Sequence, residues 1–290
     1  MFPELIDTKP LRRAVDDGLG WVVINWGSAF EAAARPLLLL LNGIEGLLVA
    51  TPWWLILAIL TGIAWLATRC WTLPAIVLVA LLFLGFMELW RDAMSTMALM
   101  IAATLTAIVL SIPIGVWMSR SARVRQIITP VLDLMQTLPS FVYLIPTVMI
   151  FGPGKIPALI ATIVYAAPPL VRLTDLGLRS VDPAVMEASR AFGTSPTQRL
   201  LGVQIPLALP TILAGINQTT MMALAMVVIA SMIGAGGLGY QVLQGIGRLE
   251  VSRGLFAGLG IVVLAIIFDR ITQAFGQRLQ SRIGLAEARP

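Results

Sequence analysis

The sequence predicts an all-α protein that crosses a membrane several times. Of its 290 residues, 58% are hydrophobic and 12% are charged, and the mean hydropathy is +0.90. An ordinary soluble domain carries about 25% charged residues, so the composition excludes that class. Eight tryptophans against three tyrosines suit a chain that needs anchors at the membrane surface. The formal charge of +5 is spread along the loops rather than gathered in a stripe, so nucleic acid is not an expected partner.

Seven crossings are predicted from apolar segments whose lengths approach the roughly 20 residues that a hydrocarbon core requires. They cover residues 52–68, 73–88, 96–118, 139–151, 156–170, 207–233 and 254–268. A helix from Gln126 is expected to lead into the fourth crossing, and a glycine-rich outer loop to separate the last two. We therefore divide the chain into an N-terminal tail and amphipathic helix (1–50), the first two transmembrane helices (51–92), a permease core (93–273) and a cytoplasmic C-terminal tail (274–290).

Residues 19–50 form an amphipathic pattern before the first crossing. Trp21 and Trp26 stand among polar neighbours, and Asn42 and Glu45 interrupt the apolar part. The pattern favours a helix that lies on the membrane surface over one that crosses the membrane, and the second alternative remains open.

The distribution of arginine and lysine predicts the orientation of the chain, because cytoplasmic loops carry an excess of these residues. One set of loops, which includes the segment between the fifth and sixth crossings and the C-terminal tail, holds twelve, and the opposite loops hold four. The coupling segment and the C-terminus are therefore expected in the cytoplasm. Seven crossings then place the N-terminus outside, although four cations in the N-terminal tail reduce the margin to twelve against eight. A crossing by residues 19–50 would place that terminus inside.

The segment between the fifth and sixth crossings carries the strongest local signals. Asp182 followed by Pro183 is typical of an N-cap with proline in the first turn, and Gly193 is a natural helix stop. Ser195 with Gln198 three residues later predicts a capping box and a second helix start. These signals predict two short helices folded back on each other in water.

The second short helix is predicted to end near Gln204. Ile205 precedes Pro206, and a residue before proline is biased away from the helical region.

The spacing of this segment resembles the cytoplasmic "EAA" loop of ABC importer permeases, the element that docks into a groove of the ATPase subunit. The matching positions are Glu187, Ala188, Ser189, Gly193, Val203, Ile205 and Pro206. Ser189, Val203 and Ile205 depart from the family pattern by small or aliphatic replacements. The alternative interpretation is an ordinary helical hairpin of a membrane protein.

Three longer runs, at 135–146, 204–212 and 226–234, resemble the glycine betaine/proline betaine permeases of bacterial ABC importers. The resemblance implies an ABC type I permease fold in the inner membrane. It also implies a second copy of this permease, two ATPase subunits that bind Mg-ATP and a periplasmic substrate-binding protein. The cargo would be a quaternary amine, namely glycine betaine, proline betaine, choline or carnitine.

The residue inventory argues against catalysis by this chain. There is no histidine, and Cys70 is the single cysteine, which excludes histidine-based catalysis and multi-cysteine metal sites. Residues 234–239 match G-x-G-x-x-G formally, but they follow an apolar helix rather than a strand, and residues 152–155 lack the Walker A spacing. We expect no catalytic residue, metal or cofactor in this chain, so a partner must supply the energy.

A translocation path in this chain should be lined by neutral groups, because the predicted crossings carry no ionisable residue away from their ends. The candidates are Phe141, Tyr143, Asn217, Gln218, Thr220 and Met221. Helix packing and interhelical hydrogen bonding are the alternative roles for these residues. Two alternative functions also remain: a secondary carrier or channel without an ATPase, and the same ABC machine with another amino-acid-like cargo.

Overall fold

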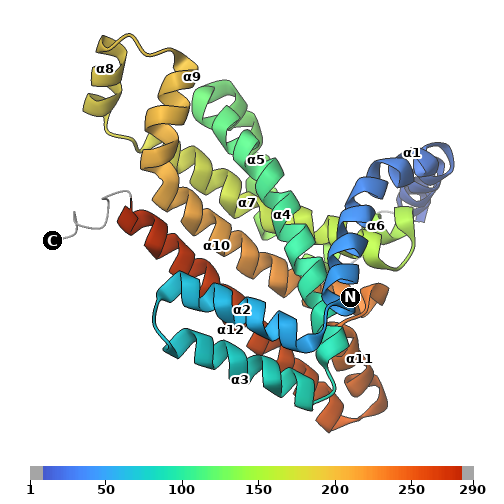
Figure 1. The fold of residues 1–290 in the computed structure, drawn as a ribbon. Coiled ribbons are helices and arrows are strands. Elements are labelled where there is room, and N and C mark those ends of the chain that lie inside the picture. Colours follow the sequence, from blue (N-terminus) through green and yellow to red (C-terminus); the bar gives the residue numbers. More distant parts are fainter. Residues whose placement is uncertain (1–8, 283–290) are drawn as a thin grey trace, which may run out of the picture.

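The computed structural model describes residues 9–282, and every regular element in this part of the chain is a helix (Figure 1). In chain order the elements are α1 (Lys9–Ala50), α2 (Trp53–Thr68), α3 (Thr72–Phe86), α4 (Trp90–Arg120), α5 (Ala122–Thr137), η1 (Ser140–Tyr143), α6 (Leu144–Phe151), α7 (Lys155–Arg179), α8 (Pro183–Ala191), α9 (Pro196–Arg199), η2 (Leu200–Gln204), α10 (Ile205–Ala230), η3 (Ser231–Ala235), α11 (Leu238–Arg248) and α12 (Val251–Arg282). The outermost parts of the two predicted tails, 1–8 and 283–290, lie outside the described residues.

Five helical stretches in the described residues are long and apolar enough to cross a membrane. They are Asp16–Ala50, Trp90–Arg120, Lys155–Arg179, Pro196–Ala235 and Val251–Gly276. The first two predicted crossings form helices α2 and α3 of 16 and 15 residues. At 1.5 Å per residue these helices are about 24 and 22 Å long, shorter than a hydrocarbon core of about 30 Å. The last helix continues past the predicted end at Phe268 to Arg282.

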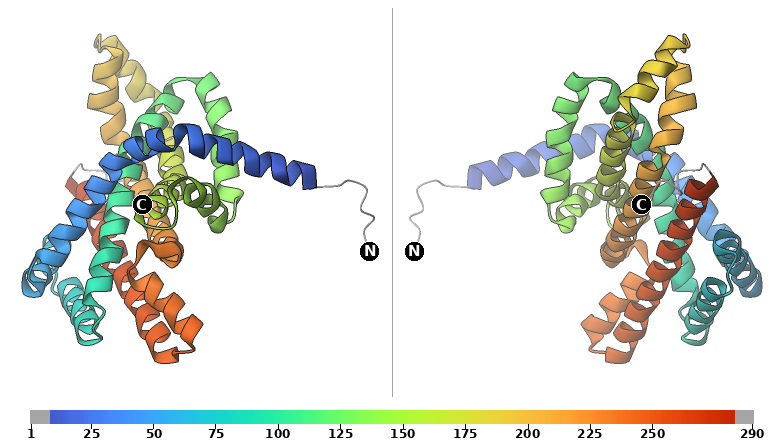
Figure 2. Two further views of the ribbon diagram at one scale, coloured as in Figure 1. Left: turned by 90° about the vertical axis from the view of Figure 1, so that its right-hand side faces the viewer. Right: turned by 90° about the vertical axis from the view of Figure 1, so that its left-hand side faces the viewer.

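Helix α1 is one continuous helix with two different environments. Its first half extends away from the bundle, whereas its second half packs on α4, α6 and α7 (Figure 2). Leu41 is 1% exposed in this contact, and the Glu45 carboxylate accepts hydrogen bonds from Ser95 at 2.9 Å and from Lys155 at 2.5 Å. The second half of α1 therefore belongs to the helix bundle, and the placement of α1 on the membrane surface stays a prediction.

The fourth crossing is not the single helix predicted for 139–151. Helix α5 and the η1–α6 segment form a pair bent by 113° at the break between Thr137 and Ser140. Leu138 and Pro139 adopt extended backbone with ψ of 134° and 140°. Pro139 lacks an N–H and disfavours helical backbone in the residue before it, so α5 ends there. Helix α6 has only eight residues, about 12 Å, so it cannot span the bilayer alone.

The predicted glycine-rich outer loop is instead a short turn followed by helix α11. Gly236 and Gly237 both have a φ of +80°, which lets the chain reverse after η3. The Leu238 N–H then donates to Thr96 Oγ1 of α4 at 2.9 Å and satisfies an amide in the first turn of α11. Gln241 of α11 donates to Asp92 at 2.6 Å. The cap comes from α4, far away in the sequence, so local pattern could not predict this helix.

Helices α4, α7 and α10 pack closely at the centre of the bundle because small residues line their contacts. Buried alanines of this core include Ala102, Ala103, Ala158, Ala161, Ala166, Ala223 and Ala230. Small side chains let helix backbones approach closely, which is the usual basis of helix association in membranes.

Gly115 of α4 offers a direct test of this close packing. A Cβ atom at position 115 would lie 2.6 Å from Thr174 Cβ and 2.8 Å from the Val171 carbonyl oxygen of α7. We expect Gly115→Ala to lower the free energy of unfolding in detergent by about 1–3 kcal/mol through overpacking. Gly258→Ala is the matched control, because nothing lies within 4 Å of its added Cβ. Equal stability of the two variants would contradict the proposed packing.

Candidate coupling hairpin and translocation path

Helix α8 starts and ends where the sequence predicts. The Asp182 carboxylate accepts a hydrogen bond from the Ala184 N–H at 2.8 Å, and Pro183 occupies the first turn. At the other end, Gly193 has a φ of +72° and donates its N–H to Arg190 O at 2.9 Å. The Thr194 N–H reaches Ser189 O at 3.3 Å, which completes a Schellman motif.

The capping box predicted for the start of the second short helix is also present in the structure. Ser195 and Gln198 form a capping box: the Ser195 N–H donates to Gln198 Oε1 at 2.9 Å, and the Gln198 N–H donates to Ser195 Oγ at 3.3 Å. Arg199 donates to Thr194 O at 3.2 Å, and Arg120 of α4 donates to Pro196 O at 3.3 Å. The turn between α8 and α9 is therefore fixed internally and tied to the end of α4.

The predicted helix end near Gln204 is wrong. Helix α9 continues through the π-helical segment η2 into α10, and the Ile205 N–H bonds to Leu200 O five residues back. Pro206 has no N–H to donate and its ring crowds the preceding turn, and a wider turn relieves both problems. The preference of a residue before proline for extended backbone is overridden here. The hairpin consequently has one free helix, α8, and one helix that is continuous with α10.

The seven positions that match the "EAA" pattern fall into an exposed group and a more enclosed group. Glu187, Ala188 and Gly193 are exposed, whereas Ser189 is only 7% exposed and its hydroxyl contacts the Thr194 hydroxyl at 2.7 Å. Val203, Ile205 and Pro206 are half-buried where the hairpin enters the bundle. A small residue is required at 189 because its side chain lies inside the turn.

The hairpin protrudes from one end of the bundle, at the end opposite α11 (Figures 1 and 2). Three of its large apolar side chains are exposed, namely Val185, Phe192 at 87% and Leu201 at 61%. A protruding element with exposed apolar side chains beside a carboxylate and arginines is typical of a protein-docking surface.

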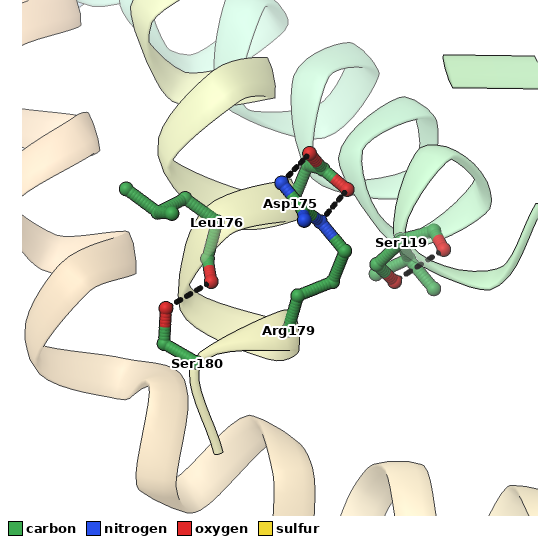
Figure 3. Close-up of polar contacts among 6 residues, drawn as sticks. Ser119, Asp175, Leu176, Arg179 and Ser180 are labelled. Atoms are coloured by element: carbon green, nitrogen blue, oxygen red, sulfur yellow. Dashed lines mark hydrogen bonds and ion pairs between the residues drawn. The ribbon is translucent and has the colours of Figure 1, made fainter. Parts of the chain in front are cut away.

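Sequence analysis did not single out a polar cluster at the end of α7, directly before the hairpin. Arg179 donates two hydrogen bonds of 3.0 Å to the Asp175 carboxylate, and Ser180 donates to Leu176 O (Figure 3). Asp175 is 5% exposed, so its charge requires this paired arginine. Arg172, one turn earlier, forms an ion pair with Asp133 of α5. The i, i+4 spacing of Asp175 and Arg179 is the sequence signal that could have identified the pair.

An open cleft of about 770 Å³ lies beside this cluster, between α4, α5 and α7. Its polar lining residues are Arg125, Gln126, Thr129, Arg172, Asp175 and Arg179.

Tyr143 and Phe141, both on η1, occupy different environments. Tyr143 is 9% exposed, donates a hydrogen bond to Met135 O and packs edge-to-face on Tyr165 with ring centroids 5.8 Å apart. Phe141 is 57% exposed on the surface of the described chain. η1 also lies against α10, which carries the remaining candidates.

The four candidates on α10 do not form a single surface. Gln218 is exposed and Met221 half-buried, whereas Thr220 is 5% exposed and donates back to Ile216 O. Asn217 is half-buried, and its Oδ1 atom has no hydrogen-bond partner within the described chain. A buried amide oxygen of this kind requires a partner from outside the chain or a water molecule. Gln218 and Phe141 remain the candidates most accessible to a path along the surface of this subunit.

The structure combines helices that are long and apolar enough to span a membrane with a capped hairpin between two of them, and sequence comparison assigns this chain to a class of transport permeases. The sequence model described as "Binding-protein-dependent transport system inner membrane component" matches residues 107–281, and the chain belongs to this family.

Two curated relatives and one solved structure show the extent of the similarity. The chain is 48% identical over 273 residues to the glycine betaine/proline betaine transport system permease protein ProW of Escherichia coli (strain K12), covering 94% of this chain and 77% of the relative. It is 41% identical over 274 residues to the glycine betaine transport system permease protein OpuAB of Bacillus subtilis (strain 168), covering 94% and 96%. A crystal form of the inward-facing MetNI methionine ABC transporter matches 67% of this chain and 95% of its own with a TM-score of 0.59. At 23% identity this last match shows the fold alone.

Proposed function

We propose that this inner-membrane transport component moves a quaternary amine of the glycine betaine, proline betaine, choline or carnitine class in an ATP-driven ABC importer. The observation that carries the cargo is the similarity to permeases named for glycine betaine and proline betaine, at 48% identity over almost the whole chain. More distant relatives are named for choline and for carnitine, at 28% and 31% identity. This range supports the amine class rather than one compound.

The proposed assembly has two copies of this permease, two ATPase subunits and a periplasmic substrate-binding protein. Mg-ATP is bound by the ATPase, and this chain holds no cofactor. The exposed Glu187, Ala188 and Phe192 on the protruding hairpin support docking to the ATPase. Closure of the ATPase dimer then moves the hairpin and shifts the population between two packings of the helices.

The distribution of arginines supports a cytoplasmic hairpin and C-terminus. The sequence-based orientation places the N-terminus in the periplasm, with α1 on the membrane surface. The packed second half of α1 supports the alternative in which it crosses, and the N-terminus then lies in the cytoplasm.

Cysteine labelling distinguishes the two orientations of the N-terminus. In a Cys70→Ser background, Ser28→Cys should react with a membrane-impermeant maleimide added outside only if the first half of α1 is periplasmic.

Transport by purified components tests the proposed function. Proteoliposomes are prepared with the permease and the ATPase in the membrane and the binding protein outside. They should accumulate radiolabelled glycine betaine only when ATP is present on the side of the membrane that carries the ATPase. Uptake that persists without the ATPase would establish the secondary carrier or channel instead. Titration of the binding protein with glycine betaine, choline and unrelated amino acids tests the cargo separately, because a failure there leaves the ATP requirement intact.

A further inference from the structure

Three arginines converge where the α2–α3 turn meets the C-terminal part of α12. Two adjoining clefts lie between these elements, of about 400 and 580 Å³. Arg270 lines the first cleft, and Arg69 and Arg278 line the second. Thr68, Thr72 and Ala274 line both clefts, which makes them neighbouring parts of one region. Among the described residues that line them, all the charged ones are arginines.

The arginine at position 69 is held in an unfavourable backbone conformation. Arg69 has a φ of +52°, in the left-handed region, and caps α2 by donating its N–H to Trp65 O at 2.7 Å. Glycine is the residue that favours this C-cap position. Arg69 shares this conformation with Glu88 and Leu249 among the described residues, and of these three it is the one that lines a basic cleft.

The surroundings of the clefts combine cationic and apolar groups. Within the described chain, the guanidinium groups of Arg69 and Arg270 have no hydrogen-bond or ion-pair partner. The other side of the first cleft is lined by Leu73, Ile76 and Ile266. The Ile76 and Ile266 side chains are about half exposed. A ligand that fits this region therefore needs an anionic group and an adjoining hydrocarbon part.

Two tryptophans lie beside the clefts, next to the α2–α3 turn. Trp65 and Trp71 flank the turn with ring centroids 6.2 Å apart, and Trp71 is 76% exposed. Exposed tryptophans concentrate at the depth of lipid headgroups. The α2–α3 turn and the C-terminal end of α12 lie on the side of the bundle away from α11 (Figure 1).

We propose that these clefts bind the phosphate headgroup of an anionic glycerophospholipid, with an acyl chain along Ile76 and Ile266. Arg69 and Arg270 contact the phosphate, and the lipid joins the α2–α3 turn to α12. Basic clefts between membrane helices at headgroup depth suit this ligand class. The site does not depend on the proposed cargo, and only its assignment to the cytoplasmic leaflet depends on the proposed orientation.

Native mass spectrometry of the purified permease–ATPase complex tests the site. The probes are phosphatidylglycerol, phosphatidylcholine with the same acyl chains, and inorganic phosphate. The wild-type complex should retain phosphatidylglycerol at one molecule per permease chain, and the other two probes should not be retained. The Arg69→Gly/Arg270→Gln double variant should lose about 25-fold in affinity for phosphatidylglycerol, at roughly fivefold per arginine.

The variants separate a lipid site from a structural role. Arg69→Gly alone should keep or raise thermal stability in lipid-free detergent, because glycine suits the left-handed backbone, while its retention of phosphatidylglycerol falls. Arg123→Gln is the matched control, an exposed arginine that follows α4 at the same end of the bundle. Equal retention by wild type and double variant would overturn the proposal. So would tight binding of phosphate alone, or loss of the ATPase from the double variant, which would assign the surface to that partner.

Discussion

Gly193→Val is expected to abolish coupled transport while leaving membrane insertion intact. Gly193 has a φ of +72°, and its N–H and that of Thr194 close the Schellman motif of α8. A β-branched residue is poorly tolerated in this left-handed conformation, so the turn must change its backbone and release α8. Substrate-stimulated ATPase activity and uptake in proteoliposomes should both fall by at least tenfold.

Two companion variants identify backbone conformation as the cause. Gly193→Asn should retain most of the activity, because asparagine tolerates left-handed backbone. Gly202→Ala, in η2, has no positive φ and nothing within 4 Å of its added Cβ, so it should behave as wild type. Wild-type stimulation by Gly193→Val would show that the turn geometry is not needed for coupling.

Glu187→Lys is expected to dissociate the ATPase from the permease. Glu187 lies on the exposed surface of α8, on an element that protrudes beyond the bundle. A reversed charge on the proposed docking surface places a cation where the partner is expected to meet a carboxylate, and a like-charge juxtaposition costs several kcal/mol. Copurification of the ATPase in detergent should fall by roughly 30-fold or more.

Glu88→Lys provides the charge-matched control. Glu88 is exposed at the other end of the bundle, after α3, so the net charge changes equally without touching α8. Glu187→Gln should give an intermediate loss, because it removes the charge without reversing it. Full copurification with Glu187→Lys would exclude α8 as the docking element.

Helix starts and stops that depend on residues only a few positions apart were predicted correctly from the sequence. Asp182, Gly193 and the Ser195–Gln198 pair control local backbone, and each does so in the structure. The membrane class follows equally from composition, because apolar helices need no tertiary information to be recognised.

Predictions that depended on distant contacts failed. Helix α11 starts against Thr96 of α4, and a glycine-rich sequence gives no sign of that contact. The second half of α1 is held by Ser95 and Lys155 through Glu45, and local pattern gives no sign of those contacts. The miss near Gln204 has a local cause instead, because the wider turn of η2 overrides the preference of Ile205 before Pro206. The roles of the translocation candidates stay predictions, because the described chain shows how exposed each side chain is and not what passes along it.

The helical run Pro196–Ala235 covers 40 residues, about 60 Å as a helix, and its backbone leaves the helical conformation near the end, at Ile233 and Gly234. If it moves as a stiff rod that pivots near its centre, a tilt of about 10° displaces each tip by roughly 5 Å. Asn217 and Gln218 lie close to that pivot and would rotate with little translation. The far tip, at Gly234 beside the Gly154 turn, would be displaced as far as the hairpin tip, so a push on the hairpin would also be felt at the opposite end of the bundle.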